Sequence, residues 1–92
     1  MVAVRFSIPV DEALLEILGH ISRDNPAAAL DLVEDLQRRI VETLSQFPDS
    51  GATFRNGRRF LTIRRYTFVY RHYPEKDEVW VMEVFGPGMD WR

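Results

Sequence analysis

The chain has 92 residues, a formal net charge of −2 and 46% hydrophobic residues, a composition typical of one small folded domain (residues 1–92) rather than a disordered segment. It has no cysteine, which excludes disulfides and thiolate metal sites, and its two histidines are too far apart to suggest a metal centre. No apolar run reaches the ~20 residues that a membrane-spanning helix needs, and no signal-peptide pattern is found. We therefore expect a cytoplasmic protein with no metal, no cofactor and no membrane contact.

The first part of the chain predicts a strand followed by a helix. Residues 2–8 alternate well enough for a short strand, with Val2, Val4, Phe6 and Ile8 on one face. Pro9 ends that strand and suits the first turn of a helix. Apolar residues then recur at helical spacing as far as Ile21, which predicts a first amphipathic helix.

A second, longer helix is predicted from Pro26 to about Gln46. Asn25 can cap the free backbone amides, and a proline at the first helical position loses no hydrogen bond. The short link to the first helix implies an antiparallel hairpin. The expected apolar stripe is Ala29, Val33, Leu36, Ile40, Leu44 and Phe47, widened by Leu30, Leu32 and Val41. Two ion pairs at i,i+4 spacing are expected on its surface, Glu34 with Arg38 and Asp35 with Arg39.

The rest of the chain predicts three strands, at residues 58–65, 66–73 and 79–85. Residues 74–78 form a polar hairpin loop between the last two, whereas Arg64-Arg65 carries no Gly, Asn or Pro to mark a turn between the first two. In a regular strand these adjacent arginines would point to opposite faces. Strict alternation along the last strand would place Val79, Val81 and Phe85 opposite Trp80, Met82 and Val84.

Charge is distributed unevenly along the chain. No acidic residue lies between Asp49 and Glu75, yet half of the chain's 12 basic residues fall in that interval. A helical hairpin can cover only one face of a sheet, so the other face would present aromatic residues and arginines to solvent or to a partner. This asymmetry creates a local positive field in a protein whose net charge is close to zero.

These elements, in this order, resemble the ParE branch of the RelE/ParE toxins of bacterial toxin–antitoxin systems, also called plasmid stabilisation proteins. The resemblance covers almost the whole chain, and its ordered set of short matches is fairly specific. The matching pieces are Ala13-Leu14-Leu15-Glu16-Ile17 through Ile21, Asn25-Pro26-Ala27-Ala28-Ala29, Ile40, Leu44, Phe47-Pro48-Asp49-Ser50-Gly51, Arg58-Arg59-Phe60, Tyr66-Thr67-Phe68-Val69-Tyr70-Arg71, Val84 and Asp90-Trp91.

The resemblance implies an α+β fold: an N-terminal strand, a helical hairpin and a three-stranded antiparallel meander (β-α-α-β-β-β). It also implies a toxin that arrests growth by binding a cellular target, with DNA gyrase the expected one, and that a cognate antitoxin neutralises in a hetero-oligomer. A family member that binds its antitoxin but is not itself toxic is a further alternative.

The family also contains RelE-type toxins, which cut messenger RNA on the ribosome, and this is the main alternative. Such cleavage needs placed cations around the phosphate and groups that move protons. The cations available for it are Arg59, Arg64, Arg65 and Arg71, with His72 a further candidate. The chain departs from the RelE pattern at Thr67, where an arginine is expected, and at Trp91, whose indole cannot act as a general acid or base. The interpretation as a binding inhibitor is therefore favoured over that as a nuclease.

The resemblance also implies that an antitoxin wraps over the helices and the sheet. Apolar anchors and arginines would carry most of that interface. The residues expected in it are Leu32, Leu36, Arg39, Arg58, Arg64, Tyr66, Phe68, Tyr70, Trp80 and Trp91.

Overall fold

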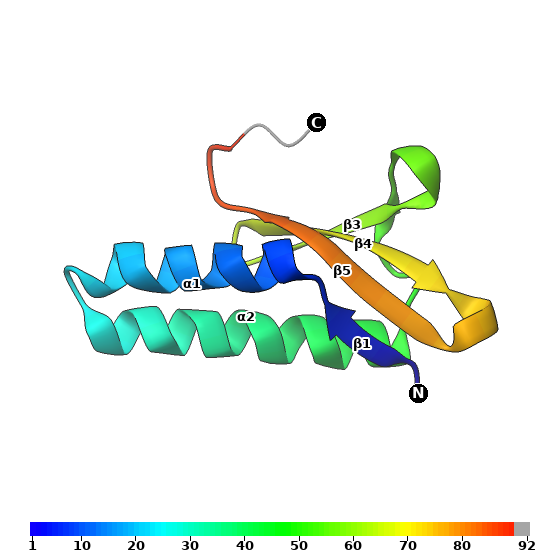
Figure 1. The fold of residues 1–92 in the computed structure, drawn as a ribbon, viewed down its shortest axis with the longest axis horizontal. Helices are drawn as coiled ribbons and strands as arrows, with labels where there is room; N and C mark the ends of the chain where they lie inside the picture. The colour runs from blue at the N-terminus through cyan, green and yellow to red at the C-terminus, as the bar shows by residue number, and fades with distance from the viewer. Residues whose placement is uncertain (90–92) are drawn as a thin grey trace.

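The computed structural model describes residues 1–89 and shows a helical hairpin packed against one face of a mixed sheet (Figure 1). Helices α1 (Ile8–Ser22) and α2 (Pro26–Gln46) lie side by side. The predicted start of α2 is confirmed, since the Asn25 side chain accepts a hydrogen bond of 3.1 Å from the amide of Ala28. Helix α1 begins one residue earlier than predicted, at Ile8, so the first strand is shorter than residues 2–8.

In the part of the chain that the structure describes, five strands form the sheet, in the order β1-β5-β4-β3-β2. They are β1 (Ala3–Phe6), β2 (Ala52–Thr53), β3 (Arg59–Ile63), β4 (Tyr66–Tyr73) and β5 (Glu78–Phe85), with short 3₁₀ turns at Arg55–Gly57 and Pro74–Lys76. The predicted α+β class and the antiparallel meander β3-β4-β5 are confirmed. The prediction missed β2, a strand of two residues, and it did not place β1, which pairs with β5 in parallel.

The connection between β3 and β4 differs from the prediction. Arg64 and Arg65 are not strand residues on opposite faces, because both adopt left-handed backbone conformations, with φ of 49° and 72°. They form a two-residue turn between Ile63 and Tyr66, which pair across the hairpin. Such turns usually carry Asn-Gly or Asp-Gly, so the arginine pair gives no sign of a turn in the sequence.

An irregularity in the pairing of β4 with β5 changes which residues face the core. Val69 pairs with Glu83 while the next residue, Tyr70, pairs with Val81, so Met82 is an extra residue on β5. Beyond it the alternation shifts by one position. Val84 is therefore buried at 8% exposure, and the predicted placement of Phe85 with Val79 and Val81 is wrong.

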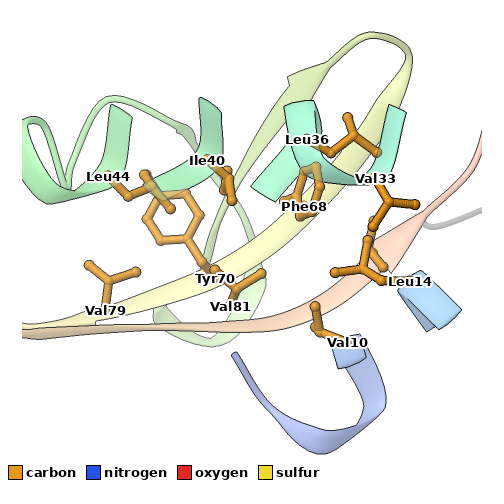
Figure 2. Close-up of a cluster of buried hydrophobic side chains, with 11 residues drawn as sticks. Val10, Leu14, Val33, Leu36, Ile40, Leu44, Phe68, Tyr70, Val79 and Val81 are labelled. Carbon is orange, nitrogen blue, oxygen red and sulfur yellow. The ribbon is translucent and has the colours of Figure 1, made fainter. Parts of the chain in front are cut away.

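The core lies between the hairpin and the inner face of the sheet. Figure 2 shows side chains of α1 and α2 gathered against those of β4 and β5. The predicted stripe of α2 is confirmed from Ala29 to Leu44, whereas Phe47, Leu30 and Val41 are exposed at 62%, 51% and 37%. Each large apolar side chain buried here contributes about 1.5–3 kcal/mol relative to exposure. Within residues 1–89, no helix is both long and apolar enough to cross a bilayer.

Candidate functional site

A cluster of charges joins α2 to the tip of the β3–β4 hairpin. The carboxylate of Asp35 accepts hydrogen bonds from Arg38, from Arg39 at 3.1 Å and from Arg64 at 3.2 Å. Partial burial acts to raise the pKa of Asp35, but the hydrogen bonds from Arg39, Arg64 and Arg38 outweigh it and hold that pKa below its ordinary value. We call these four residues the Asp35 cluster.

The cluster confirms one of the two ion pairs predicted on α2 and corrects the other. Arg39 contacts Asp35 as expected, with its Nε 3.0 Å from a carboxylate oxygen. Arg38 does not contact Glu34 and instead contacts Asp35 and, at 3.6 Å, Glu42. Sequence reasoning also missed the contact of Asp35 with Arg64, because 29 positions separate them in the chain.

Arg59 and His72 hold the loop that follows α2. Arg59 donates to the carbonyl of Gly51 at 2.9 Å, and its Nε lies 3.7 Å from a carboxylate oxygen of Asp49. The Nδ1 atom of His72 lies 3.0 Å from the same oxygen. The amide of Gly51 in turn donates to the hydroxyl of Tyr70. The structure therefore gives these two candidates for phosphate chemistry a role in positioning the loop.

The four arginines named for a nuclease do not converge. Arg59 pairs across the sheet with Tyr70, so it lies on the helix side, and Arg71, the next residue after Tyr70, lies on the opposite side. Arg71 stacks on the ring of Tyr73, at 5.2 Å from its centroid. Arg64 and Arg65 occupy the turn that follows Ile63, which lies four residues and roughly 13 Å along the strand from Arg59. A single phosphate could not contact all four.

The face of the sheet turned away from the helices, which includes Arg5, Arg71 and Trp80, is the open face. Glu78 there accepts a hydrogen bond of 2.6 Å from Arg5, and this bond, with a further one from Trp80, lowers the pKa of Glu78. Arg58 pairs with Glu83 at 3.1 Å. Trp80 and Arg58 are thus partly exposed and hydrogen-bonded to neighbouring acids.

The other residues expected in a partner interface fall into three groups. Leu36, Phe68 and Tyr70 are fully buried at 0% exposure, so the prediction that they face a partner is wrong: they form the core. Leu32 and Tyr66 are partly buried and pack against that core while remaining accessible. Trp91 lies outside the described residues.

An apolar surface that the predicted set did not include lies on the outer side of the helical hairpin. Leu15 is 66% exposed and lines a groove of about 280 Å³ between α1 and α2. The other residues of this groove, which we call the hairpin groove, are Asp11, Leu14, Leu18, Val33 and Gln37. Helical spacing leaves Leu15 outside the apolar face predicted for the first helix, and its exposure agrees with that pattern. Residues 1–89 hold no cluster of side chains that could bind a metal ion.

Comparison with known proteins places this fold. A family profile described as "ParE toxin of type II toxin-antitoxin system, parDE" matches residues 4–91. The chain belongs to the ParE toxin family. No curated protein sequence matches the chain significantly.

Solved structures of this fold agree with that membership. A chain of the chromosomal ParDE system from P. aeruginosa is 22% identical, with a TM-score of 0.79 over 95% of this chain and 97% of that one. A chain of the intact E. coli RelBE toxin–antitoxin complex is 20% identical, with a TM-score of 0.65 over 98% and 100%. A chain of the RelBE2 complex from Mycobacterium tuberculosis is 21% identical, with a TM-score of 0.65 over 96% and 93%. At these identities the similarity establishes the fold that ParE and RelE proteins share.

Proposed function

We propose that this toxin arrests growth by binding a cellular protein, with DNA gyrase as the target, rather than by cutting RNA. The observation that carries the proposal is the dispersal of the arginines. Arg59 and His72 are engaged with the loop after α2, Arg64 is held by Asp35, and Arg71 lies on the other side of the sheet. Cleavage of a phosphodiester needs cations and proton-transfer groups aimed at one phosphate. Membership of the ParE family supports the same choice.

A growth and enzyme assay tests this proposal. Induction of the chain alone is expected to arrest growth and to leave bulk transcripts intact, and the purified chain is expected to inhibit supercoiling by purified gyrase. Arg64→Ala and Arg65→Ala serve as the nuclease control. If transcripts are cut on induction and either variant stops the cutting, the ribonuclease alternative replaces the proposal. If induction changes neither growth nor supercoiling, the chain is a non-toxic member of the family.

We further propose that a cognate antitoxin neutralises the chain by covering the hairpin groove. The structures of similar fold come from toxin–antitoxin systems, and the exposed Leu15 beside Leu18 offers the apolar anchor point that a partner helix or extended segment needs. Farther along the path of the antitoxin, the proposed contacts are Leu32, Arg39, Arg58, Tyr66 and Trp80. Localisation in the cytoplasm follows from the proposed target.

One substitution in the hairpin groove tests the proposed antitoxin binding separately from the proposed growth arrest. Leu15→Glu is expected to weaken antitoxin binding strongly, because a carboxylate would be buried against leucines, while the growth arrest persists even when the antitoxin is co-expressed. Ile8→Glu is the matched control, since Ile8 is an exposed apolar residue of α1 outside the groove. Equal neutralisation of both variants would show that the antitoxin binds elsewhere.

A further inference from the structure

The turn at Arg64 and Arg65 is conformationally costly. Apart from these two, every residue with positive φ among residues 1–89 is of a type that tolerates it: Asn56, Gly57, Asp77 and Gly88. Within this described range, long side chains occur at positive φ in this turn alone, twice in succession. Asn-Gly would form the same turn without strain. Because the arginines are not needed to make the turn, their side chains call for another explanation.

Positive charge is in excess around this turn. Asp35 is shared among Arg38, Arg39 and Arg64, whose side chains remain 57%, 52% and 42% exposed. Glu42 contacts Arg38 as well, and Arg65 has no acidic partner within residues 1–89. Asp35 and Glu42 thus contact three guanidiniums, those of Arg38, Arg39 and Arg64, and these remain accessible to an anionic group from outside.

The outer edge of β3 beside these arginines has no neighbouring strand among the described residues. Strand β2 pairs with β3 only at Arg59 and Phe60. The two-residue turn makes Ile63 and Tyr66 a hydrogen-bonded pair, so the backbone amide and carbonyl of Thr62, one residue earlier, point away from β4 and toward this edge. A backbone edge of this kind is where an extended peptide adds to a sheet.

A groove of about 470 Å³ joins the free edge to the charged residues. It lies between α2 and the end of β3. We call it the arginine groove, and its lining is Arg38, Arg39, Glu42, Thr43, Thr62, Ile63 and Arg64. The guanidiniums can pair with carboxylates in two-pronged geometry, while Thr62 can pair with a peptide backbone.

We propose that the arginine groove binds an extended acidic segment of a partner protein, whose backbone pairs with Thr62 and whose carboxylates contact Arg38, Arg39 and Arg64. The phosphates of a nucleic acid could pair with the arginines, but a nucleic acid has no peptide backbone to hydrogen-bond with the edge of β3. The free backbone groups of this edge therefore favour a peptide. This inference deepens the proposed function and rests on it, because the proposed function is what makes the partner a protein.

The test uses the purified chain, made by cell-free synthesis, and a short synthetic peptide of alternating valine and glutamate. Titration of the isotope-labelled chain, followed by NMR, is expected to shift the amide resonances of Thr62 to Arg65 and to slow hydrogen exchange at the Thr62 amide. A peptide of alternating valine and lysine is the charge control. The double variant Arg38→Gln/Arg39→Gln is expected to weaken binding about tenfold, since two exposed charge pairs are lost. Arg23→Gln, an equal change of charge at the exposed link between the helices, is expected to leave binding unchanged.

A variant of the turn between β3 and β4 tests the proposal independently of Arg38 and Arg39. Arg64→Asn/Arg65→Gly is expected to raise the thermal midpoint and to weaken peptide binding about tenfold, a combination that loss of folding cannot produce. The proposal is overturned if the lysine peptide binds equally well, if the shifts fall outside the groove, or if an oligothymidylate binds there and displaces the acidic peptide. No growth assay enters the test, so a chain that arrests growth but ignores the peptide refutes this site alone.

Discussion

The backbone amide of Gly51 donates a hydrogen bond of 2.9 Å to the hydroxyl of Tyr70, a fully buried residue of β4. This bond fastens the loop after α2 to the centre of the sheet. A Cβ atom on Gly51 would lie 2.6 Å from the carbonyl oxygen of Phe60 and 2.7 Å from the Tyr70 hydroxyl. The space at Gly51 is therefore filled on two sides, by backbone and by a packed ring.

Gly51→Ala is expected to destabilise the protein by about 1–3 kcal/mol, because the added methyl overpacks a site that cannot yield. Urea denaturation followed by circular dichroism measures the change. Gly19→Ala is the control, since no atom lies within 4 Å of its added Cβ and Gly19 is inside α1. This second change is expected to stabilise by about 0.5–1 kcal/mol through helix propensity. Similar stabilities for the two variants would contradict the close packing at Gly51.

The burial of Tyr70 leads us to expect that the folded protein becomes less stable at alkaline pH. Burial raises the pKa of Tyr70 above its ordinary value, although the Gly51 amide and Arg59 act in the opposite direction. The folded state then holds the phenolic proton more tightly than the unfolded state, so this stabilisation is complete below the unfolded pKa of about 10 and falls as the pH rises past it. Tyr70→Phe is expected to lose about 1–3 kcal/mol at neutral pH, because the Gly51 amide is left without its acceptor, and to flatten the alkaline decline. An unchanged alkaline slope in this variant would assign the decline to other groups.

Asp35 predicts the opposite dependence in acid. Its folded pKa lies below the ordinary value, so its stabilisation is present above the unfolded pKa of about 3.9 and is lost as the pH falls through the folded pKa. Thermal midpoints measured from pH 5 down to about pH 2 are expected to fall less steeply in Asp35→Asn than in the wild type. Asp31→Asn is the control on the same helix, since Asp31 has no ion pair within residues 1–89. If the two variants give parallel curves, the three arginines contribute nothing to acid sensitivity.

The cap of α2 predicts a smaller effect that is easy to isolate. Asn25→Ala removes the acceptor of the Ala28 amide and is expected to cost about 1 kcal/mol. Asn25→Asp retains an acceptor and is expected to stay close to the wild type. Chemical denaturation of the three proteins side by side measures both. Equal losses in the alanine and aspartate variants would show that the side chain acts through something other than the cap.

The parts of the fold that the sequence predicted are those with local signals. Asn25-Pro26 and the spacing from Ala29 to Leu44 marked α2, because capping and periodicity act within a few residues. The Arg64-Arg65 turn has no such signal, since tertiary contacts impose a conformation that arginine disfavours. No sequence signal marks Met82 as an extra residue either. It is fixed only by how β5 pairs with β4.

The candidate site was harder to predict than the fold. Both faces of β4 carry large residues, so the pattern alone could not tell the buried Phe68 and Tyr70 from residues that face a partner. The Asp35 cluster joins positions far apart in the chain, and charge patterning is informative only along one helix. The clustering of arginines in the sequence also suggested a single site. In the structure, the alternation of strand residues and the turn between β3 and β4 place these arginines on separate surfaces.

The parallel pairing of β1 with β5 has a consequence for synthesis on the ribosome. Arg5 and Glu78, bonded across these strands, are 73 positions apart. During translation β1 therefore has no strand to join until nearly the whole described chain has emerged. Until then, the apolar stripe of α2 also lacks the part of its cover that Val79, Val81 and Val84 provide. A fragment that stops before Glu78 would expose core residues, so quality control by proteases is expected to remove interrupted products before they could act on a target.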